Sequence, residues 1–372
     1  MNQATCHRRK LHQIPELSYQ EFKTKEYILS VLKGLNCEII EVLTTGVCAY
    51  FYRGKEKTIA FRADMDALPI QEETGIEFAS CHEGKMHACG HDGHMALLLG
   101  FAEELHQLAD SEFKHNVLLV FQPSEETVGG AQPICETGIF EEKNTFAIFG
   151  THLYPFLEKG AIGSRPNEFM ACASEVDITV MGKSTHAAES EKGIDPIEIG
   201  AELLQRLYQM EREQIDPKQY RILKFGYFEG GTVRNIIPEK VKMGGSYRSF
   251  YPEVFDFMIR RTQEIITELE IETGCKIDFK YTEGYPSLMN DEKLFQILKQ
   301  TLSKEFHFVQ FKKPFMIAED FSFYCKRLPG CFMYLGTGTE IALHNCHFDF
   351  DEEILQNGIK AYLRLMNIDG IE

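Results

Sequence analysis

Short apolar runs that stop at polar segments constrain this fold more than any other feature of the sequence. VLLVF (117–121) and FAIFG (146–150) are such runs, and TIAFRA (58–63) and CFMYL (331–335) are further strand candidates. Runs of this length are typical of strands buried inside a parallel or mixed sheet that helices cover. The sequence therefore predicts an α/β sheet domain, with polar groups gathered at the carboxyl ends of its strands.

The pattern changes after about residue 170 and returns to α/β after about residue 285. Between these points SEVDITVMG alternates like a half-exposed strand, and Asp195-Pro196 opens a helix with a capping aspartate and a first-turn proline. A chain of 372 residues also exceeds the usual size of a single hydrophobic core. We expect a sheet domain made of residues 1–172 and 283–372, interrupted by an inserted α+β domain of residues 173–282.

Two helix starts are expected in the first part of the chain. Ser18-Tyr19-Gln20-Glu21 resembles a capping box before an amphipathic helix that begins at Phe22. Asp92 is expected to cap a helix through MALLLGFAEEL, which places Cys89 and His91 on the loop just before it.

Composition narrows the classes of partner. The net charge of -17 argues against nucleic acid and anionic membrane surfaces, because both repel an acidic protein. No apolar stretch follows the basic residues of MNQATCHRRK and no apolar run reaches about 18 residues, so we expect no secretory signal and a cytoplasmic protein that handles small molecules. The eleven scattered cysteines without CxxC spacing are expected to be reduced thiols.

The segment MHACGHDGH (86–94) concentrates side chains that bind metals. Cys89 and His91 are two residues apart on the expected loop, and thiolate and imidazole are good ligands for zinc and similar ions. The spacing alone supports a metal role no better than a structural one. A lone histidine of this kind is more often a structural residue.

Three further segments carry ligand-type residues to the same edge of the expected sheet. Glu125 and Glu126 follow one buried strand, His152 follows the next, and a late glycine-rich loop carries His344 and His347. A solvated acidic turn is the ordinary explanation for the glutamates. Convergence of four segments instead favours a metal site, in which one glutamate binds the ion and the other remains free as a base.

The remaining histidines receive more ordinary interpretations. His87 is expected to be structural or to support a ligand, and Asp66 either orients a ligand histidine or caps a loop. The sequence leaves His82 and His94 open. The histidines expected at the surface are His7, His12, His106, His115 and His307.

Ten segments in order along the chain carry a resemblance: HRRKLHQIPELSYQE (7–21), FRADMDALPI (61–70), MHACGHDGH (86–94), QPSEE (122–126), GTH (150–152), GKSTHAA (182–188), GGTVRNIIPE (230–239), SYRSF (246–250), AEDFS (318–322) and LHNCHFDFDE (343–352). Through them the chain resembles the M20 metallopeptidase superfamily, specifically its amidohydrolase branch. That branch contains hippurate hydrolase, auxin-conjugate hydrolases and N-acetyldiaminopimelate deacetylase.

This resemblance implies roles for individual residues. Glu125 falls on the catalytic base, and His186 falls on a histidine of the inserted domain that reaches the substrate carbonyl, often from a neighbouring subunit. Asn235 and Arg248 fall on positions near the substrate's amide and carboxylate. The positions of the ligands to two divalent ions, Mn or Zn with Co or Ni as further options, are Cys89, His91, Glu126, His152 and His344.

Two departures from the family pattern bear on substrate preference. Ser190-Glu191 replaces a frequent Pro-His, and Cys346 stands where proline is usual. Neither removes a ligand or the base.

The resemblance implies a two-metal catalytic domain with an inserted dimerisation or lid domain, and hence a homodimer. The expected reaction is hydrolysis of an N-acyl amino acid or similar small conjugate by a metal-activated water, with Glu125 as proton carrier. A dipeptidase or carboxypeptidase on the same site is the nearest alternative, and a non-catalytic metal-binding protein is the alternative of another class. No G-x-S-x-G elbow and no Walker loop occurs in the sequence.

Overall fold

The computed structural model describes residues 2–369, which form two compact units. The second unit consists of Met170–Leu288 and Pro314–Glu319, and the first unit contains the rest of the chain. The expected insertion, 173–282, thus starts three residues late and ends six residues early relative to this division. Pro314–Glu319 also belongs to the second unit, although it was expected in the sheet domain with the rest of 283–372.

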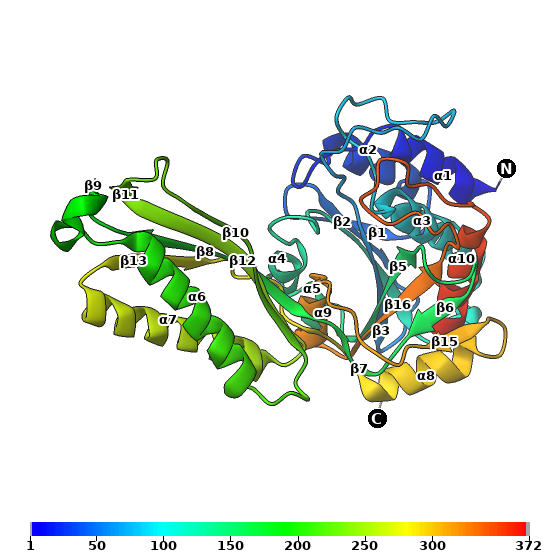
Figure 1. Cartoon of the computed structure of the whole chain (residues 1–372). Coiled ribbons are helices and arrows are strands. Elements are labelled where there is room, and N and C mark those ends of the chain that lie inside the picture. The colour runs from blue at the N-terminus through cyan, green and yellow to red at the C-terminus, as the bar shows by residue number, and fades with distance from the viewer. Residues whose placement is uncertain (1, 370–372) are drawn as a thin grey trace. The chain divides into compact units, whose positions relative to one another are not determined.

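The first unit is built on a mixed eight-stranded sheet (Figure 1). Its four central strands are parallel, and the pairs β1–β2, β2–β4 and β16–β6 are antiparallel. The fold class expected from the sequence is therefore confirmed. In spatial order the strands are β1 (Glu38–Val42), β2 (Gly46–Phe51), β4 (Asn116–Gln122), β3 (Thr58–Asp64), β5 (Thr145–Tyr154), β16 (Gly330–Gly336), β6 (Ile162–Ser164) and β15 (Phe308–Gln310).

Helices cover both faces of this sheet, which explains why the central strands β3 and β4 are buried along their whole length and mostly apolar. On one face, Phe61 of β3 packs against Phe101 and Tyr362 with ring centroids 5.0 and 4.6 Å apart. On the other face, Phe332 of β16 packs on Phe321 at 5.0 Å. The first face carries α1 (Gln3–His12), α2 (Phe22–Leu32), α3 (His91–Gln107), α8 (Glu292–Leu302) and α10 (Ile354–Leu365), and the second carries α4 (Ala131–Glu136), α5 (Ile139–Glu142) and α9 (Ser322–Arg327).

The two expected caps in the first unit are wrong, because tertiary contacts use their side chains instead. Glu21 precedes α2 but makes no capping bond, and Ser18 donates to Asp66. Asp92 lies inside the first turn of α3, where its carboxylate accepts a hydrogen bond from Arg8. Helix α3 begins at His91, one residue before Asp92, so His91 belongs to the helix and not to the preceding loop as expected.

The second unit is a four-stranded antiparallel sheet in the order β10 (Arg221–Gly230), β12 (Lys240–Ser249), β8 (Cys172–Met181) and β13 (Lys276–Tyr281). Helices α6 (Pro196–Glu213) and α7 (Pro252–Thr273) pack on one face of it. The alternating burial along β8 agrees with its sequence pattern. The expected cap is confirmed, since Asp195 accepts the backbone N–H of Ile197 at 2.8 Å.

Short elements complete the described chain. None of the helices within residues 2–369 is both long and apolar enough to cross a membrane. The eleven cysteines, all of which lie in this range, are free thiols as expected. The short elements are β6 and β15 above, β7 (Asn167–Met170) paired with β14 (Leu288–Asn290), β9 (Thr185–His186) paired with β11 (Ile236–Ile237), and the 3-10 turns Asp110–Glu112 and Ala187–Lys192.

Candidate metal centre

The carboxyl ends of the four parallel strands bring the candidate ligands together. Asp64 ends β3, Gln122 ends β4 just before the glutamate pair, and His152 lies near the end of β5. The loop that follows β16 carries His344. Because parallel strands finish at one edge of the sheet, residues far apart in sequence meet there.

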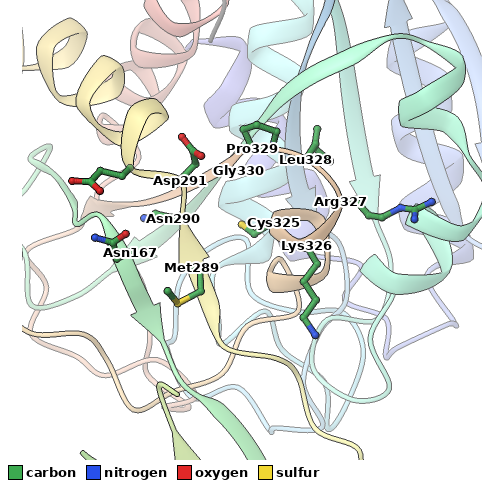
Figure 2. A pocket seen from close by; sticks show the side chains of 11 residues that line it. Asn167, Met289, Asn290, Asp291, Cys325, Lys326, Arg327, Leu328, Pro329 and Gly330 are labelled. Atoms are coloured by element: carbon green, nitrogen blue, oxygen red, sulfur yellow. The ribbon is translucent and has the colours of Figure 1, made fainter. Parts of the chain in front are cut away.

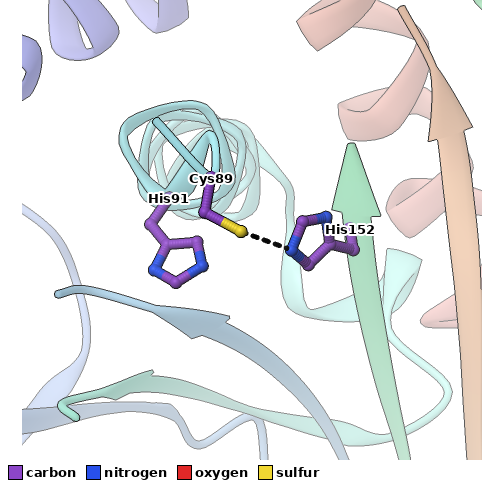
Figure 3. A group of neighbouring side chains, drawn as sticks. All are labelled: Cys89, His91 and His152. Carbon is purple, nitrogen blue, oxygen red and sulfur yellow. Dashed lines mark hydrogen bonds between the residues drawn. The ribbon is translucent and has the colours of Figure 1, made fainter. Parts of the chain in front are cut away.

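Cys89 is at the centre of this cluster. Its Sγ lies 3.4 Å from Nε2 of His152, as Figure 3 shows, and 3.2 Å from Nε2 of His344. Cys89 and His152 are buried, whereas the His344 side chain is 51% exposed. The cluster therefore has a closed side and an open side, and His344 stands on the open side.

His91 and Glu126 extend the cluster. Glu126 Oε1 lies 3.8 Å from Nε2 of His91 and 3.3 Å from Nε2 of His344. Both Glu126 Oε1 and His91 Nε2 are buried without a hydrogen-bond partner. A buried polar atom without a partner is costly. A cation bound between these atoms would remove that cost, so the residues present fit a metal ion.

The ligand atoms form overlapping groups of three, each with its atoms within 4.8 Å of one another. Three of these groups contain the expected ligands: Cys89, His91 and His152; Cys89, Glu126 and His344; and His91, Glu125 and Glu126. All five expected ligands are therefore brought together beside Glu125. Sulfur, imidazole nitrogen and carboxylate oxygen form a ligand set that suits zinc and related divalent ions.

Electrostatics in the cluster also favours cations. Burial, and then the charges of Glu126 and Glu125, hold the pKa of the Cys89 thiol well above its usual value. Burial disfavours charge on His91, but Asp64 and the other nearby carboxylates outweigh it and raise its pKa to about 10. Protons thus neutralise a site rich in carboxylates, and a metal ion that binds there must displace them.

Asp66 fixes the glutamate pair. Its two carboxylate oxygens accept the backbone N–H groups of Glu125 and Glu126 at 2.9 and 3.0 Å. His91 Nδ1 lies 2.8 Å from the backbone carbonyl of Asp66, so this nitrogen donates and Nε2 is left to face the cluster. Asp66 therefore orients a candidate ligand histidine, which was one of the two interpretations of the sequence, but it does so through its backbone oxygen.

The side chains of Glu21 and Thr45 hold the turn between β4 and the glutamate pair. Ser124 adopts a left-handed backbone conformation with φ of 59°. Its N–H donates to Glu21, whose other carboxylate oxygen accepts from Thr45 at 2.7 Å. Burial raises the pKa of Glu21 to about 7. The residue expected to belong to a helix cap thus supports the site instead.

His186, Asn235 and Arg248 lie in the second unit. His186 and Asn235 are neighbours there, because Ala187 donates its N–H to the carbonyl of Asn235 and His186 pairs with Ile236. Both side chains are exposed. Arg248 lies on β12, where it donates to the carbonyl of Met316 and to Ser246.

A family model, described as peptidase family M20/M25/M40, matches residues 60–368. The chain belongs to this family. An uncharacterised hydrolase of Staphylococcus epidermidis is 38% identical over 370 residues, 97% of each chain, and another of Staphylococcus haemolyticus is 35% identical over 99% of this chain and 98% of its own. The solved Bacillus subtilis YXEP protein, described as a dinuclear metal-binding peptidase of the M20 family, superposes with a TM-score of 0.84 and 32% identity over 98% and 96% of the two chains.

Some of the residues that support the site of this M20 hydrolase were not recognised from sequence. His94, left open, accepts the N–H of Leu153 and lies 2.6 Å from Asp64. Asp64 also accepts from Arg62 at 2.7 Å, and Arg62 donates to Asp320 at the same distance. These charges are buried in pairs, which is how ionised groups persist inside a protein. The sequence feature that could have indicated these buried pairs is Arg62, a charged residue between the apolar Phe61 and Ala63 of an expected buried strand.

Two of the histidines expected at the surface of this M20 hydrolase are buried, so that expectation is wrong for them. His7 contacts Tyr27 at 2.8 Å, and His12 contacts Asp92 at 2.8 Å. The charged residues around them indicated a surface location, but α1 packs on α3 and this packing buries both histidines. His87, expected to be structural or supporting, is buried as well.

A pocket of about 590 Å³ also occurs in the first unit, between the start of α8 and the end of α9 (Figure 2). Asn167, Asp291 and Cys325 are among its lining residues. Among the described residues that line this pocket, none is one of the nine expected site residues.

Proposed function

We propose that this M20 hydrolase is a metal-dependent amidohydrolase that removes the acyl group from N-acyl amino acids or similar small conjugates. The observation that carries the proposal is the convergence of the five expected ligand side chains with Glu125, whose carboxylate lies within 4.8 Å of the ligand atoms of His91 and Glu126. A protein that only stored metal would have no need of Glu125. The resemblance to the amidohydrolase branch supports the choice of substrate class.

Cys89, His91, Glu126, His152 and His344 are proposed to hold two divalent ions, Mn or Zn. Such ions, when bound, supply a Lewis acid for the amide carbonyl and lower the pKa of water. Glu125 is proposed to take a proton from the attacking water on its carboxylate and to return one to the departing amine. Asp66 keeps that carboxylate in place through the backbone of Glu125.

His186 is proposed to stabilise the oxyanion, and Arg248 to pair with a substrate carboxylate through its planar guanidinium. The β8–β12 register pairs Arg248 with Ala173 and Lys240 with Met181, so His186 lies beyond the far end of the strand from Arg248. Eight residues of strand span roughly 26 Å at about 3.3 Å per residue. That exceeds the length of an N-acyl amino acid.

One substrate therefore cannot contact both residues of a single subunit, if the sheet keeps this form. The roles proposed for His186 and Arg248 are compatible when a second copy supplies one of them. This supports the proposed homodimer with shared active sites. A small-molecule substrate and a cytoplasmic location are likewise proposed, the latter from the free thiols.

A hydrolysis screen tests the proposed function. Metal-free protein is reconstituted with Mn or Zn and assayed against N-acetyl and N-benzoyl amino acids and against dipeptides with a free amine. The proposal expects a higher kcat/KM for the N-acyl amino acids, with turnover that depends on added metal. Preference for dipeptides would favour the dipeptidase alternative, and no turnover of either class would contradict the proposal.

A further inference from the structure

A second cluster of ligand-type side chains lies outside the centre described above. Glu73 belongs to the segment between β3 and α3, whereas Cys346 and His347 belong to the loop between β16 and α10. Their ligand atoms lie within 4.8 Å of one another. None of these three residues has a role in the proposed hydrolysis.

The distances suit a small ion. Oε2 of Glu73 lies 3.6 Å from Nε2 of His347 and 3.7 Å from Sγ of Cys346. Around tetrahedral zinc, with bonds of about 2.0 Å to nitrogen or oxygen and about 2.3 Å to sulfur, neighbouring ligand atoms are roughly 3.3–3.7 Å apart. Zinc could therefore be bound with little movement of these side chains.

The imidazole of His347 is oriented as in a metal ligand. Its Nδ1 lies 2.8 Å from the backbone carbonyl of Glu73, which can only accept, so Nδ1 carries a proton. Nε2 then faces the Glu73 carboxylate. Histidines that bind metals are commonly held by this kind of hydrogen bond from the other ring nitrogen. The lone pairs of His347 Nε2 and of the Glu73 carboxylate repel each other unless a proton or a metal ion lies between them.

Backbone contacts hold the cluster together without an ion. Glu73 donates its N–H to the carbonyl of Cys346 at 2.9 Å, and His347 donates its N–H to Asn345 Oδ1 at 2.9 Å. The arrangement is therefore fixed by the two segments and not only by the side chains. A fixed arrangement lowers the cost of binding, because less ordering remains to be done.

We propose that Glu73, Cys346 and His347 bind a third divalent ion, zinc in preference to manganese, with its remaining position open to water. The thiolate of Cys346 provides the preference for zinc. The Glu73 and His347 side chains are 61% and 55% exposed, so binding is weaker than in a buried site. The ion joins two segments, one of which carries His344 two residues before Cys346. Zinc thereby stabilises the loop on the open side of the metal centre.

Zinc stoichiometry tests this proposal on the full-length, metal-free protein by competition with a chromophoric chelator. Wild type is expected to bind one more equivalent than Cys346→Ser and His347→Ala. Cys81→Ser, which alters an exposed thiol outside the cluster, is the matched control and should equal wild type. Equal stoichiometry in wild type and both cluster variants overturns the proposal. The test compares the zinc stoichiometry of wild type with that of each variant, so its outcome does not depend on whether the proposed hydrolysis is found.

Alkylation provides an independent readout that does not depend on variant folding. Zinc is expected to slow iodoacetamide modification of Cys346 by about tenfold or more in wild type, measured by peptide mass spectrometry. Modification of Cys81 should be unchanged. If zinc at saturation leaves the Cys346 rate unaltered, Cys346 is not a ligand, and the His347–Glu73 contact is an ordinary surface ion pair.

Discussion

Oδ1 of Asp66 accepts a 2.9 Å hydrogen bond from the backbone N–H of Glu125. The other oxygen accepts from the N–H of Glu126 and from the hydroxyl of Ser18, at 3.0 and 2.7 Å. The same residue's carbonyl oxygen contacts His91. A single buried aspartate thus positions the proposed base and two proposed ligands.

Replacing Asp66→Asn should weaken metal binding about 10- to 100-fold, as is typical when a group that supports ligands is altered. One carboxylate oxygen becomes an amide N–H₂, which then faces a backbone N–H. Equilibrium dialysis with Mn or Zn measures the effect. Ser18→Ala, which removes one donor and keeps the carboxylate, should have a much smaller effect. Unchanged affinity in Asp66→Asn would show that the backbone of the glutamates needs no such support.

The adjacent glutamates should differ in their variants. Glu125→Gln is expected to retain its metals and to lose about a hundredfold to ten-thousandfold in kcat, the usual contribution of a general base. Glu126→Gln should instead lose metal, because the Glu126 carboxylate lies between the imidazoles of His91 and His344, at 3.8 and 3.3 Å from their Nε2 atoms. Metal content and kcat are measured on the same samples. Equal loss of metal in both variants would refute the proposed division of roles.

His186→Ala is expected to keep its metals and fold and to lose about a hundredfold in kcat, as for other oxyanion donors. Lys192→Ala, on the adjacent exposed turn, is the control. Mixed dimers of His186→Ala and Glu125→Gln subunits should recover part of the activity if His186 acts across the subunit boundary. Verified mixed dimers without activity would exclude the shared site.

The buried pair of His12 and Asp92 predicts a pH-dependent stability. Burial lowers the pKa of His12, but the Asp92 carboxylate outweighs it and raises that pKa to about 9. Because the unfolded value is about 6.5, the folded state binds more protons between these values, so this stabilisation is full below pH 6.5 and is lost as pH rises through 9.

Chemical denaturation at several pH values measures this dependence. The difference in free energy of unfolding between wild type and His12→Gln should shrink as pH rises from 6.5 to 9. His307→Gln, which alters an exposed histidine, is the control. A difference that stays constant over this range would mean that His12 is not charged in the folded protein.

The sequence by itself determined the main strands and the set of candidate ligands. VLLVF and FAIFG are strands because runs this short and apolar bury best inside a covered sheet. Cys89, the glutamate pair and His152 could be grouped from sequence because their segments were expected at the same sheet edge, and the family resemblance then singled out Glu126 as the ligand. Asp195 could be recognised as a cap because its bonds are local.

Only the tertiary structure decided how these residues are supported. Asp66 holds Glu125 across 59 positions, and Arg62 donates to Asp320 across 258. No local pattern encodes a partner at such a separation. Ser18 and Asp92 have good local capping patterns, yet stronger buried partners, Asp66 and Arg8, take their side chains. A buried charge must be paired, and that requirement outweighs a helix cap worth about 1 kcal/mol.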